Sequence, residues 1–250
     1  MSATRSLAGQ TAIVTGAARR VGEHIVRALH TAGANVMIHC HRSLEDAQRL
    51  AEELNRVRKD SAGVAVADLR DTAQLPGLIA QTCERFGGLN LLVNNASSFY
   101  ATPLGSITPQ QWNDLVGTNL QAPLFLAQAA AAPLRRSRGS LINIVDIHGL
   151  RPLRDYAVYC TAKAGLIMLT RALARELAPQ VRVNGIAPGA VLWPEAGMDA
   201  ERKQKILGQI PLQRAGAPED IARTVLFFAA DAPFVTGQIL AVDGGRSIAW

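Results

Sequence analysis

The chain has 250 residues, of which 48% are hydrophobic and 18% charged, a balance that excludes a disordered protein and fits one folded domain better than two. Its net charge is +6, but the basic residues are scattered among acidic ones along helical patterns, so we expect no nucleic-acid partner. A site for an anionic or phosphorylated small molecule is a better use of the positive excess.

Seven short strand candidates alternate with longer helical patterns along the chain. The strand candidates are the apolar runs at residues 11–16, 35–41, 63–69, 90–96, 140–147, 181–189 and 238–245. The clearest helical pattern covers residues 43–59, where one face carries Leu44, Ala47, Leu50, Ala51 and Leu54. This alternation predicts an α/β fold, a single-domain, Rossmann-like, doubly wound parallel sheet of about seven strands with helices on both faces.

The first strand leads into the stretch TGAARRVG, residues 15–22, and from there into a predicted helix at 23–33. Gly16 and Gly22 bracket this turn, and a turn of small residues lets backbone N–H groups approach a pyrophosphate at the helix N-terminus. The fully glycine-rich form of the turn has a third glycine where this chain has Arg20. The alternative interpretation is an ordinary turn from strand to helix.

The ends of the second and third strands predict which nucleotide binds. An NAD site places Asp or Glu about 20 residues beyond the glycine turn, to hold the ribose 2′-hydroxyl. Here the stretch HCHRS, residues 39–43, has no acidic residue, and Arg42 and Ser43, with His39 or His41 nearby, suit a 2′-phosphate. A solvated strand end with incidental basic residues is the alternative. Asp68, after the third strand, is placed to accept from the adenine amino group.

Polar residues also follow the fourth and fifth strands. The stretch NNAS, residues 94–97, ends the fourth strand, and Asp146 ends the fifth. A carboxylate at the end of a buried strand is costly unless something pairs with it. The structural alternative for Asp146 is a cap, or an ion pair with Arg151 or Arg154.

Tyr159 and Lys163 lie four residues apart in the helix that follows the fifth strand, so both face one side of it. Tyr156 offers a second tyrosine, but seven residues from the lysine. Because ligands bind at the carboxyl edge of parallel sheets, we expect the pair to meet Asp146 there.

Farther along, residues 190–210 resist assignment and are expected to form a loop with a short helix, which would be a natural lid. We expect this lid to belong to one domain that spans residues 1–250.

Taken together, T-G-x₃-R-x-G, N-N-A, Y-x₃-K, VRVNGIAPG and VDGG resemble the short-chain dehydrogenase/reductase family across essentially the whole chain. The resemblance implies that Tyr159 is the general acid/base, that Lys163 lowers its pKa and holds the nicotinamide ribose, and that Asn119 supports a water and proton relay. It also implies a homotetramer formed through the helices containing 109–136 and 155–178. The implied cofactor contacts are Gly16, Arg20, Val21, Gly22, His41, Arg42, Ser43, Asp68, Leu69, Asn95, Ala96, Ser97, Tyr159, Lys163, Pro188 and Gly189.

At two positions this chain differs from most of the family, and there it resembles one subfamily, the pteridine reductases and bacterial dihydropterin reductases. Most members of the wider family have Ser thirteen residues before the tyrosine, where this chain has Asp146, and Gly where it has Arg20. The stretches HCHRS and NASSFY point the same way. The subfamily implies a pterin stacked by Phe99 against the nicotinamide and a substrate site of Arg20, Ser97, Phe99, Asp146, Tyr159 and Trp193, with Trp193 as an aromatic wall.

Asp146 also carries a chemical argument about the substrate. A carbonyl reductase must stabilise an oxyanion, which a carboxylate would repel. Reduction of a C=N bond instead gives the ring nitrogen a proton, which a carboxyl group bonded to Tyr159 can help to deliver. Because tyrosine ordinarily titrates near 10, bringing Tyr159 toward 7 requires Lys163 and the oxidised nicotinamide to outweigh an ionised Asp146.

The sequence therefore predicts NADPH-dependent reduction of 7,8-dihydropterin or dihydrofolate to the tetrahydro form. The alternatives are a short-chain reductase of a carbonyl substrate such as a 3-oxoacyl thioester, and a non-catalytic NADPH-binding sensor.

Cellular location and metal content complete the expectations. The first ten residues lack the apolar core of a signal peptide, and no stretch reaches the roughly 20 apolar residues of a membrane span. Cys40, Cys83 and Cys160 form no CxxC pair and no metal-binding spacing. We therefore expect a cytoplasmic protein with no membrane partner and no metal.

Overall fold

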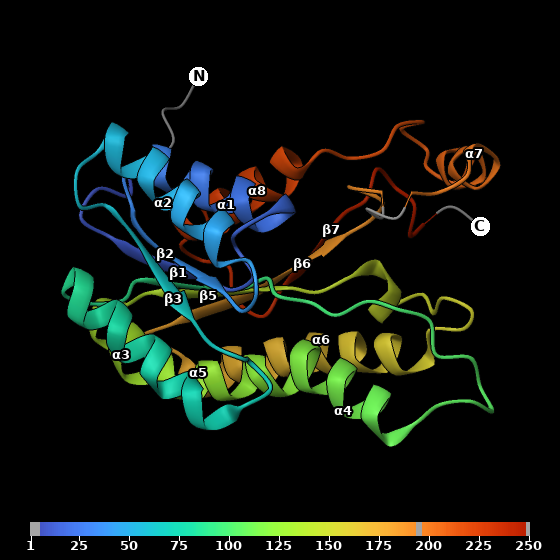
Figure 1. Cartoon of the computed structure of the whole chain (residues 1–250), viewed down its shortest axis with the longest axis horizontal. Coiled ribbons are helices and arrows are strands. Elements are labelled where there is room, and N and C mark those ends of the chain that lie inside the picture. Colours follow the sequence, from blue (N-terminus) through green and yellow to red (C-terminus); the bar gives the residue numbers. More distant parts are fainter. Residues whose placement is uncertain (1–5, 194–196, 249–250) are drawn as a thin grey trace.

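Seven parallel strands form one sheet in the computed structural model, which describes residues 6–193 and 197–248 (Figure 1). Their order across the sheet is β3-β2-β1-β4-β5-β6-β7. The strands are β1 (Thr11–Val14), β2 (Asn35–Cys40), β3 (Ala62–Val66), β4 (Leu91–Asn94), β5 (Ser140–Ile144), β6 (Arg182–Pro188) and β7 (Ile239–Val242). The fold class predicted from the sequence is therefore confirmed.

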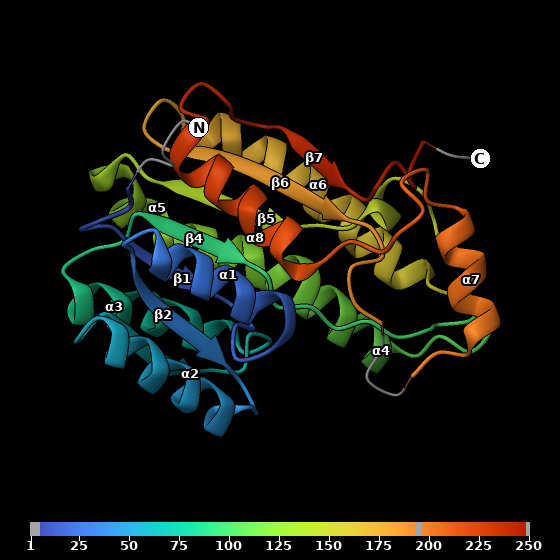
Figure 2. The ribbon, with the colours of Figure 1, turned by 90° about the horizontal axis from the view of Figure 1, so that it is seen from above.

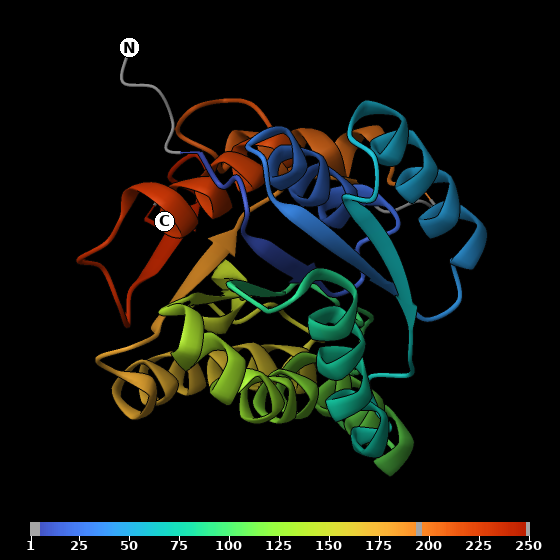
Figure 3. The ribbon, with the colours of Figure 1, turned by 90° about the vertical axis from the view of Figure 1, so that its left-hand side faces the viewer.

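Helices cover both faces of this sheet in three layers (Figures 1 and 3). One face carries α1 (Arg20–Thr31), α2 (Leu44–Val57) and α8 (Pro218–Leu226). The other face carries α3 (Leu75–Phe86), α4 (Pro109–Val116), α5 (Ala122–Ser137) and α6 (Ala157–Leu177). A further helix, α7 (Ala200–Gly208), stands apart from both layers (Figure 2). Short 3₁₀ turns lie at Thr72–Gln74 and Ile147–Gly149, and π-helical turns at Gly117–Gln121 and Phe227–Asp231.

The hydrophobic core is divided between the two faces by the pleat of the strands. In β1, Ala12 and Val14 pack on the side of α1 and α8, whereas Ile13 packs on the side of α3 and α5. All three residues are almost fully buried. Burial on both faces explains why the strands read as continuous apolar runs and not as alternating ones.

The predicted elements occur where the sequence placed them, with differences at their ends. Each observed strand lies within or close to its predicted range but is shorter. Helix α1 begins at Arg20 rather than at Glu23, and Leu44 of α2 is 40% exposed, so it is not part of the buried face. The region 190–210 contains irregular chain and then α7, as expected; residues 194–196 lie outside the described residues.

Among the described residues, one helix, α6, is long and apolar enough to cross a membrane by length and composition alone. Half of its apolar stretch is buried inside the fold. Its inner face packs on the sheet and includes fully buried Ala162 and Thr170. The hydropathy of α6 is thus explained by the packing of its inner face on the sheet.

The strand order reverses between β1 and β4, and this reversal opens a crevice at the carboxyl ends of the strands. Thr15 and Asn95 bind the two chain segments that leave the sheet here. The Thr15 hydroxyl oxygen accepts from the backbone N–H groups of Asn95 at 2.9 Å and Ala96 at 3.0 Å, and the Asn95 side-chain amide donates to the Thr15 carbonyl at 2.8 Å. These bonds fix the crevice on which the functional site is built.

Candidate active site

A cavity of about 770 Å³ runs along the carboxyl edge of the sheet. Every residue that the sequence predicted to contact a cofactor lines it, together with Phe99 and Asp146. Two predicted residues do not line it: Asn119 is buried behind it, and Trp193 lies outside it. The cavity therefore collects residues from the chain segments that follow β1 to β6 into one continuous site.

Gly16 and Gly22 are required by close backbone approach in the turn after β1. Gly16 has φ +60°, and a Cβ added to it would lie 2.9 Å from the Ala96 Cα. A Cβ on Gly22 would lie 2.4 Å from the Gly16 carbonyl oxygen. The turn therefore packs this closely against the segment after β4 only with glycine at both positions, and a tight turn of this kind agrees with the predicted pyrophosphate turn.

Arg20 occupies an unusual backbone conformation, with φ +56°. This left-handed region suits glycine and costs other residues about 1 kcal/mol or more, which explains the glycine that the family pattern has here. The guanidinium donates to the Trp193 carbonyl oxygen at 3.3 Å. Arg20 thus joins the turn after β1 to the segment after β6, across the mouth of the cavity.

His39 ties three strand ends together from inside the fold. Its Nδ1 accepts from the Gly16 backbone N–H at 3.1 Å, and its Nε2 donates to the Ala67 carbonyl at 3.2 Å. Burial lowers the pKa of His39 to about 4, so the imidazole is neutral at pH 7. His39 is therefore a structural tie and not a cationic phosphate ligand, whereas His41 and Arg42 are exposed at the cavity rim.

The carboxyl group of Asp146 has two separate partners. One oxygen accepts from the His148 backbone N–H at 2.8 Å and caps the short turn Ile147–Gly149. The other accepts from the Tyr159 hydroxyl at 2.7 Å. From the sequence, Asp146 as a cap and Asp146 as the partner of Tyr159 were alternative interpretations. In the structure its carboxyl group has both roles.

Tyr159 and Lys163 are both buried against the sheet. Burial lowers the pKa of Lys163 to about 8, although the nearby Asp146 charge raises it, and its Nζ donates to the Ile144 carbonyl at 3.0 Å. For Tyr159, burial, then the Asp146 charge and the hydrogen bond to it, raise the pKa well above 10, with a hydrogen bond to Ser97 opposing. The protein's own groups therefore keep the proton on Tyr159 at neutral pH. The lowered tyrosine pKa implied by the family resemblance requires the oxidised nicotinamide as well as Lys163, and it stays a prediction.

Asn119 acts on the site through Ser97. It lies in the π-helical turn Gly117–Gln121, where its amide donates to the carbonyls of Ser98 and Leu115, both at 2.9 Å. These two bonds orient its oxygen, which accepts from the Ser97 hydroxyl at 2.7 Å. Ser97 also lowers the pKa of Tyr159, so the Asn119–Ser97 pair lies beside the tyrosine that donates to Asp146.

Phe99 lies at the substrate end of the cavity and is 50% exposed. Its ring stacks on Tyr156, with centroids 4.7 Å apart and planes 18° apart, and meets Tyr159 edge-on at 4.8 Å. Tyr156, which the sequence offered only as a second tyrosine, thus supports Phe99. The expectation for Trp193 is not met, because its ring lies 5.9 Å from the Lys203 ammonium of α7 and the cavity wall is formed by Val191 and Leu192 instead.

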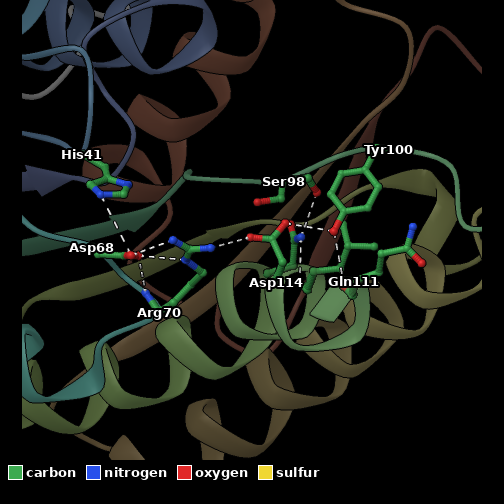
Figure 4. Close-up of polar contacts among 9 residues, drawn as sticks. His41, Asp68, Arg70, Ser98, Tyr100, Gln111 and Asp114 are labelled. Carbon is green, nitrogen blue, oxygen red and sulfur yellow. Dashed lines mark hydrogen bonds and ion pairs between the residues drawn. The ribbon is translucent and has the colours of Figure 1, made fainter. Parts of the chain in front are cut away.

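Sequence reasoning missed a group of charged and polar residues beside the adenosine end of the cavity (Figure 4). Arg70 donates to Asp68 through Nε at 3.0 Å and Nη2 at 2.7 Å, and to Asp114 through Nη1 at 3.1 Å. The Tyr100 hydroxyl donates to Asp114 at 3.0 Å. Asp68 and Arg70 are neighbours in sequence, but Asp114 is 44 residues from Arg70, so no local pattern could have joined them.

Three comparisons with known proteins agree on the family and divide on the substrate. The family model described as "Enoyl-(Acyl carrier protein) reductase" matches residues 16–247. Pteridine reductase 1 of Leishmania tarentolae is 36% identical, with 98% of this chain and 99% of that protein covered. The 3-oxoacyl-[acyl-carrier-protein] reductase FabG of Staphylococcus aureus is also 36% identical, covering 94% and 97%.

Among solved structures, a Sinorhizobium meliloti protein assigned as a short-chain alcohol dehydrogenase superposes with a TM-score of 0.93. It is 31% identical to this chain, and the alignment covers 99% of this chain and all of that one. The agreement extends over the whole fold, not over one motif.

His39 predicts a loss of stability in acid. Its pKa is about 4 when folded and 6.5 by ordinary reference, so between these values the unfolded chain binds a proton that the folded chain does not. Lowering the pH through this window should therefore reduce the free energy of unfolding, by roughly 3 kcal/mol in total from this one group. Urea titrations between pH 7 and pH 4.5 measure the slope. It should be shallower in His39→Gln, and an equal slope in both proteins would assign the acid sensitivity elsewhere.

Proposed function

The chain belongs to the short-chain dehydrogenase/reductase family and is an NAD(P)-dependent oxidoreductase, and on that premise we propose that it is an NADPH-dependent reductase of dihydropterins. Relatives of equal identity are named for a pteridine and for a 3-oxoacyl thioester. Overall similarity therefore does not choose the substrate, and the choice has to be argued from the residues of the site.

The observation that carries the proposal is the hydrogen bond between Tyr159 and Asp146. A carboxylate 2.7 Å from the proton-donating hydroxyl opposes the negative charge that develops on a carbonyl oxygen during reduction. It opposes reduction of a C=N bond less, because the basic ring nitrogen can take its proton before the hydride arrives, and no negative charge then develops on the substrate. A carboxylate at this position therefore favours an imine-like substrate, such as the C=N bond of a dihydropterin ring.

The protein's own groups suit a proton donor in this reaction. NADPH, when bound, supplies the hydride that adds to the carbon of the C=N bond. Burial and Asp146 keep Tyr159 protonated at neutral pH, and its hydroxyl lines the same cavity as Phe99. The Tyr159 hydroxyl donates to Asp146, so it has to turn from Asp146 to the ring nitrogen to deliver its proton, and the tyrosinate that remains regains a proton from solvent.

The nucleotide end of the cavity fits a phosphorylated dinucleotide. Gly16 and Gly22 allow the close backbone approach in the turn after β1, and residues 41–43, directly after β2, include no acidic residue, whereas exposed His41 and Arg42 lie there at the rim. Hydrogen bonds from Arg70 are the main cause that lowers the pKa of Asp68 to about 2, so it remains an acceptor for an adenine amino group at neutral pH. These features support NADPH over NADH.

The substrate end fits a flat heteroaromatic ring. Phe99 is half exposed and its ring is held by the stacked Tyr156, so we propose that a planar ligand packs against the exposed part of the ring at little conformational cost. Arg20 reaches from the cofactor turn toward the segment after β6, where it can contact both ligands.

A second candidate is the reduction of a 3-oxoacyl thioester, which the FabG relative favours by its name and equal identity. Asp146 is the feature that disfavours it. A third, a non-catalytic NADPH sensor, is disfavoured by the ordered contacts among Tyr159, Lys163 and the end of β5. NADPH oxidation measured with a panel of dihydropterins, dihydrofolate and 3-oxoacyl thioesters separates the three.

The assembly and location expected from the sequence also remain proposals. Apolar side chains exposed on α4, α5 and α6, namely Trp112, Leu124 and Met168, support a homotetramer through these helices. Sedimentation should then give a mass four times 26.7 kDa. Three free cysteines, at positions 40, 83 and 160, are consistent with the proposed reducing, cytoplasmic location.

Arg42→Ala tests the cofactor. If the guanidinium contacts a 2′-phosphate, its loss should remove a charge-assisted hydrogen bond worth roughly 1.5–3 kcal/mol, which raises the KM for NADPH about 10- to 100-fold. The KM for NADH should change little. Arg49→Ala, a surface residue of α2 paired with Asp46, is the matched control. Equal efficiency of the unmodified protein with NADH and NADPH would contradict the assignment.

Asp146→Asn tests the chemistry apart from the fold. The amide oxygen of asparagine can still accept from His148 N–H, so the cap survives while the negative charge beside Tyr159 is lost. We expect kcat for a dihydropterin to fall roughly 10²- to 10⁴-fold with little change in melting temperature. Asp146→Ala should lose activity similarly and also lose the cap, at a cost of about 1 kcal/mol in stability.

The same pair of variants gives the contradicting result. If Asp146→Asn retains near-normal kcat while Asp146→Ala is destabilised, Asp146 is a cap only, and the argument for a C=N substrate loses its support. Asp146→Ser should lose the dihydropterin reaction and gain weak activity on the 3-oxoacyl thioester, because a hydroxyl then faces the oxyanion.

Arg20→Gly separates backbone strain from ligand contact. Glycine adopts φ +56° freely, so the variant should be as stable as the unmodified protein or more stable by up to about 1 kcal/mol. Its KM for NADPH and for dihydropterin should nevertheless rise, whereas Arg20→Lys should retain part of the affinity for NADPH. A stabilised Arg20→Gly protein with unchanged kinetics would remove Arg20 from the site.

A further inference from the structure

Four side chains connect the adenosine end of the cavity with its substrate end. We call Asp68, Arg70, Asp114 and Tyr100 the Arg70 bridge (Figure 4). The Arg70 guanidinium donates two parallel hydrogen bonds to the Asp68 carboxylate through Nε and Nη2, and one to the Asp114 carboxylate through Nη1. All four residues line the cavity, although they come from three separate parts of the chain. The bridge therefore spans the length of the site along one wall.

The far end of the bridge holds the segment of residues 97–102, which carries Ser97 and Phe99. This segment follows β4 and has no helical or strand hydrogen bonding over most of its length. Its position depends on contacts with its neighbours, and the bond from the Tyr100 hydroxyl to Asp114 is one of them. Asn119 holds the Ser98 carbonyl, and the Thr102 N–H donates to the Asp155 carbonyl at 2.6 Å.

The Arg70 bridge differs from the ion pairs on the outer surface. Arg56 and Glu52 form a pair with 75% and 69% of their side chains exposed and 3.8 Å between them. Asp68 and Asp114 are instead 27% and 29% exposed and Arg70 is 42% exposed, and the Arg70 guanidinium lies 2.7 and 3.1 Å from the two carboxylates. Bidentate and networked pairs of this kind keep a fixed geometry, whereas isolated surface pairs contribute little.

The near end of the bridge leaves room for a ligand. The Asp68 carboxylate accepts three hydrogen bonds from Arg70, from its backbone N–H, Nε and Nη2. A carboxylate has about four acceptor positions, so one remains for an adenine amino group. A ligand at Asp68 therefore shares the carboxylate with Arg70, and any shift of Asp68 is passed to Asp114 and Tyr100.

We propose that Arg70, Asp114 and Tyr100 are positioning residues, which hold segment 97–102 in place for the substrate and couple it to the adenosine half of the cofactor at Asp68. The inference rests on the proposed function for the identity of the two ligands. It adds a role for residues outside the catalytic group, because none of the three supplies the hydride or the proton.

Tyr100→Phe and Asp114→Asn test the positioning role. Each removes one link of the bridge with little change in shape. We expect the KM for dihydropterin to rise about fivefold to tenfold, the usual worth of one hydrogen bond. The KM for NADPH measured at saturating dihydropterin should rise with it, because the coupling is reciprocal, whereas kcat should stay within about twofold of the unmodified value. Asp114→Glu, which keeps the acceptor, should recover part of the loss, and Arg85→Ala, at an exposed pair with Asp60, should have no effect. Unchanged KM in both bridge variants would overturn the proposal.

Hydrogen exchange tests the coupling without any substrate. The probe is 2′,5′-ADP, which fills the adenosine half of the site alone. It should slow exchange of the backbone amides in residues 97–102 by severalfold, and this slowing should be absent from Asp114→Asn and Tyr100→Phe although both still bind the probe. Because coupling is reciprocal, dihydropterin should tighten 2′,5′-ADP by the same factor that 2′,5′-ADP tightens dihydropterin.

The outcomes separate this inference from the proposed function. Binding of 2′,5′-ADP with unchanged exchange in residues 97–102 would overturn the inference and leave the reductase proposal intact. Slowed exchange in a protein that oxidises no NADPH with dihydropterins would support the inference and overturn the pterin substrate. No binding of 2′,5′-ADP would remove the adenosine site on which both depend.

Discussion

The chemistry of this site depends on how the fold satisfies one carboxyl group, that of Asp146. A charge at the end of a buried strand is retained only if its oxygens find donors. Here one oxygen is used by the turn after β5 and the other by Tyr159 of α6. The same bond that makes the carboxylate tolerable also fixes the tyrosine hydroxyl in the cavity. Burial of α6 then keeps the proton on Tyr159 and lowers the pKa of Lys163 to about 8.

The nucleotide end is fixed by buried polar side chains that join neighbouring strand ends. Thr15 and Asn95 connect the segments after β1 and β4, and His39 connects those after β1 and β3 from its place in β2. Each tie satisfies backbone groups that the sheet leaves unpaired at its edge. The glycine turn is therefore held in shape by the protein itself, so binding need not supply the cost of ordering it.

The sequence was sufficient for whatever depends on local pattern. Strand and helix alternation predicted the fold, and the four-residue spacing of Tyr159 and Lys163 predicted that both would face the sheet edge. It was insufficient where burial or distance decides. His39 could not be told from a phosphate ligand until its burial was known, and the partnership of Arg70 with Asp114 crosses 44 residues. The pKa of Tyr159 depends on how deeply the tyrosine is buried beside Asp146, which no motif contains.

The two differently named relatives are equally identical to this chain, so overall identity does not choose the substrate. Arg20 and Asp146 provide a chemical argument instead. Both residues are locally unfavourable: one places an arginine in a backbone region suited to glycine, and the other places a carboxylate beside a tyrosine whose proton it makes harder to remove. Local conflicts of this kind tend to gather where a ligand, rather than the fold, sets the requirement.

Arg20 and Asp146 both line one cavity, at the positions where the pyrophosphate turn and the proton donor meet. Both unfavourable features are accounted for by a ligand that needs a cation near its phosphates, which Arg20 supplies, and a carboxylate near the transferred proton, which Asp146 supplies. In the proposed function, a dihydropterin beside NADPH has those two properties, whereas a 3-oxoacyl thioester would present Asp146 with a developing negative charge.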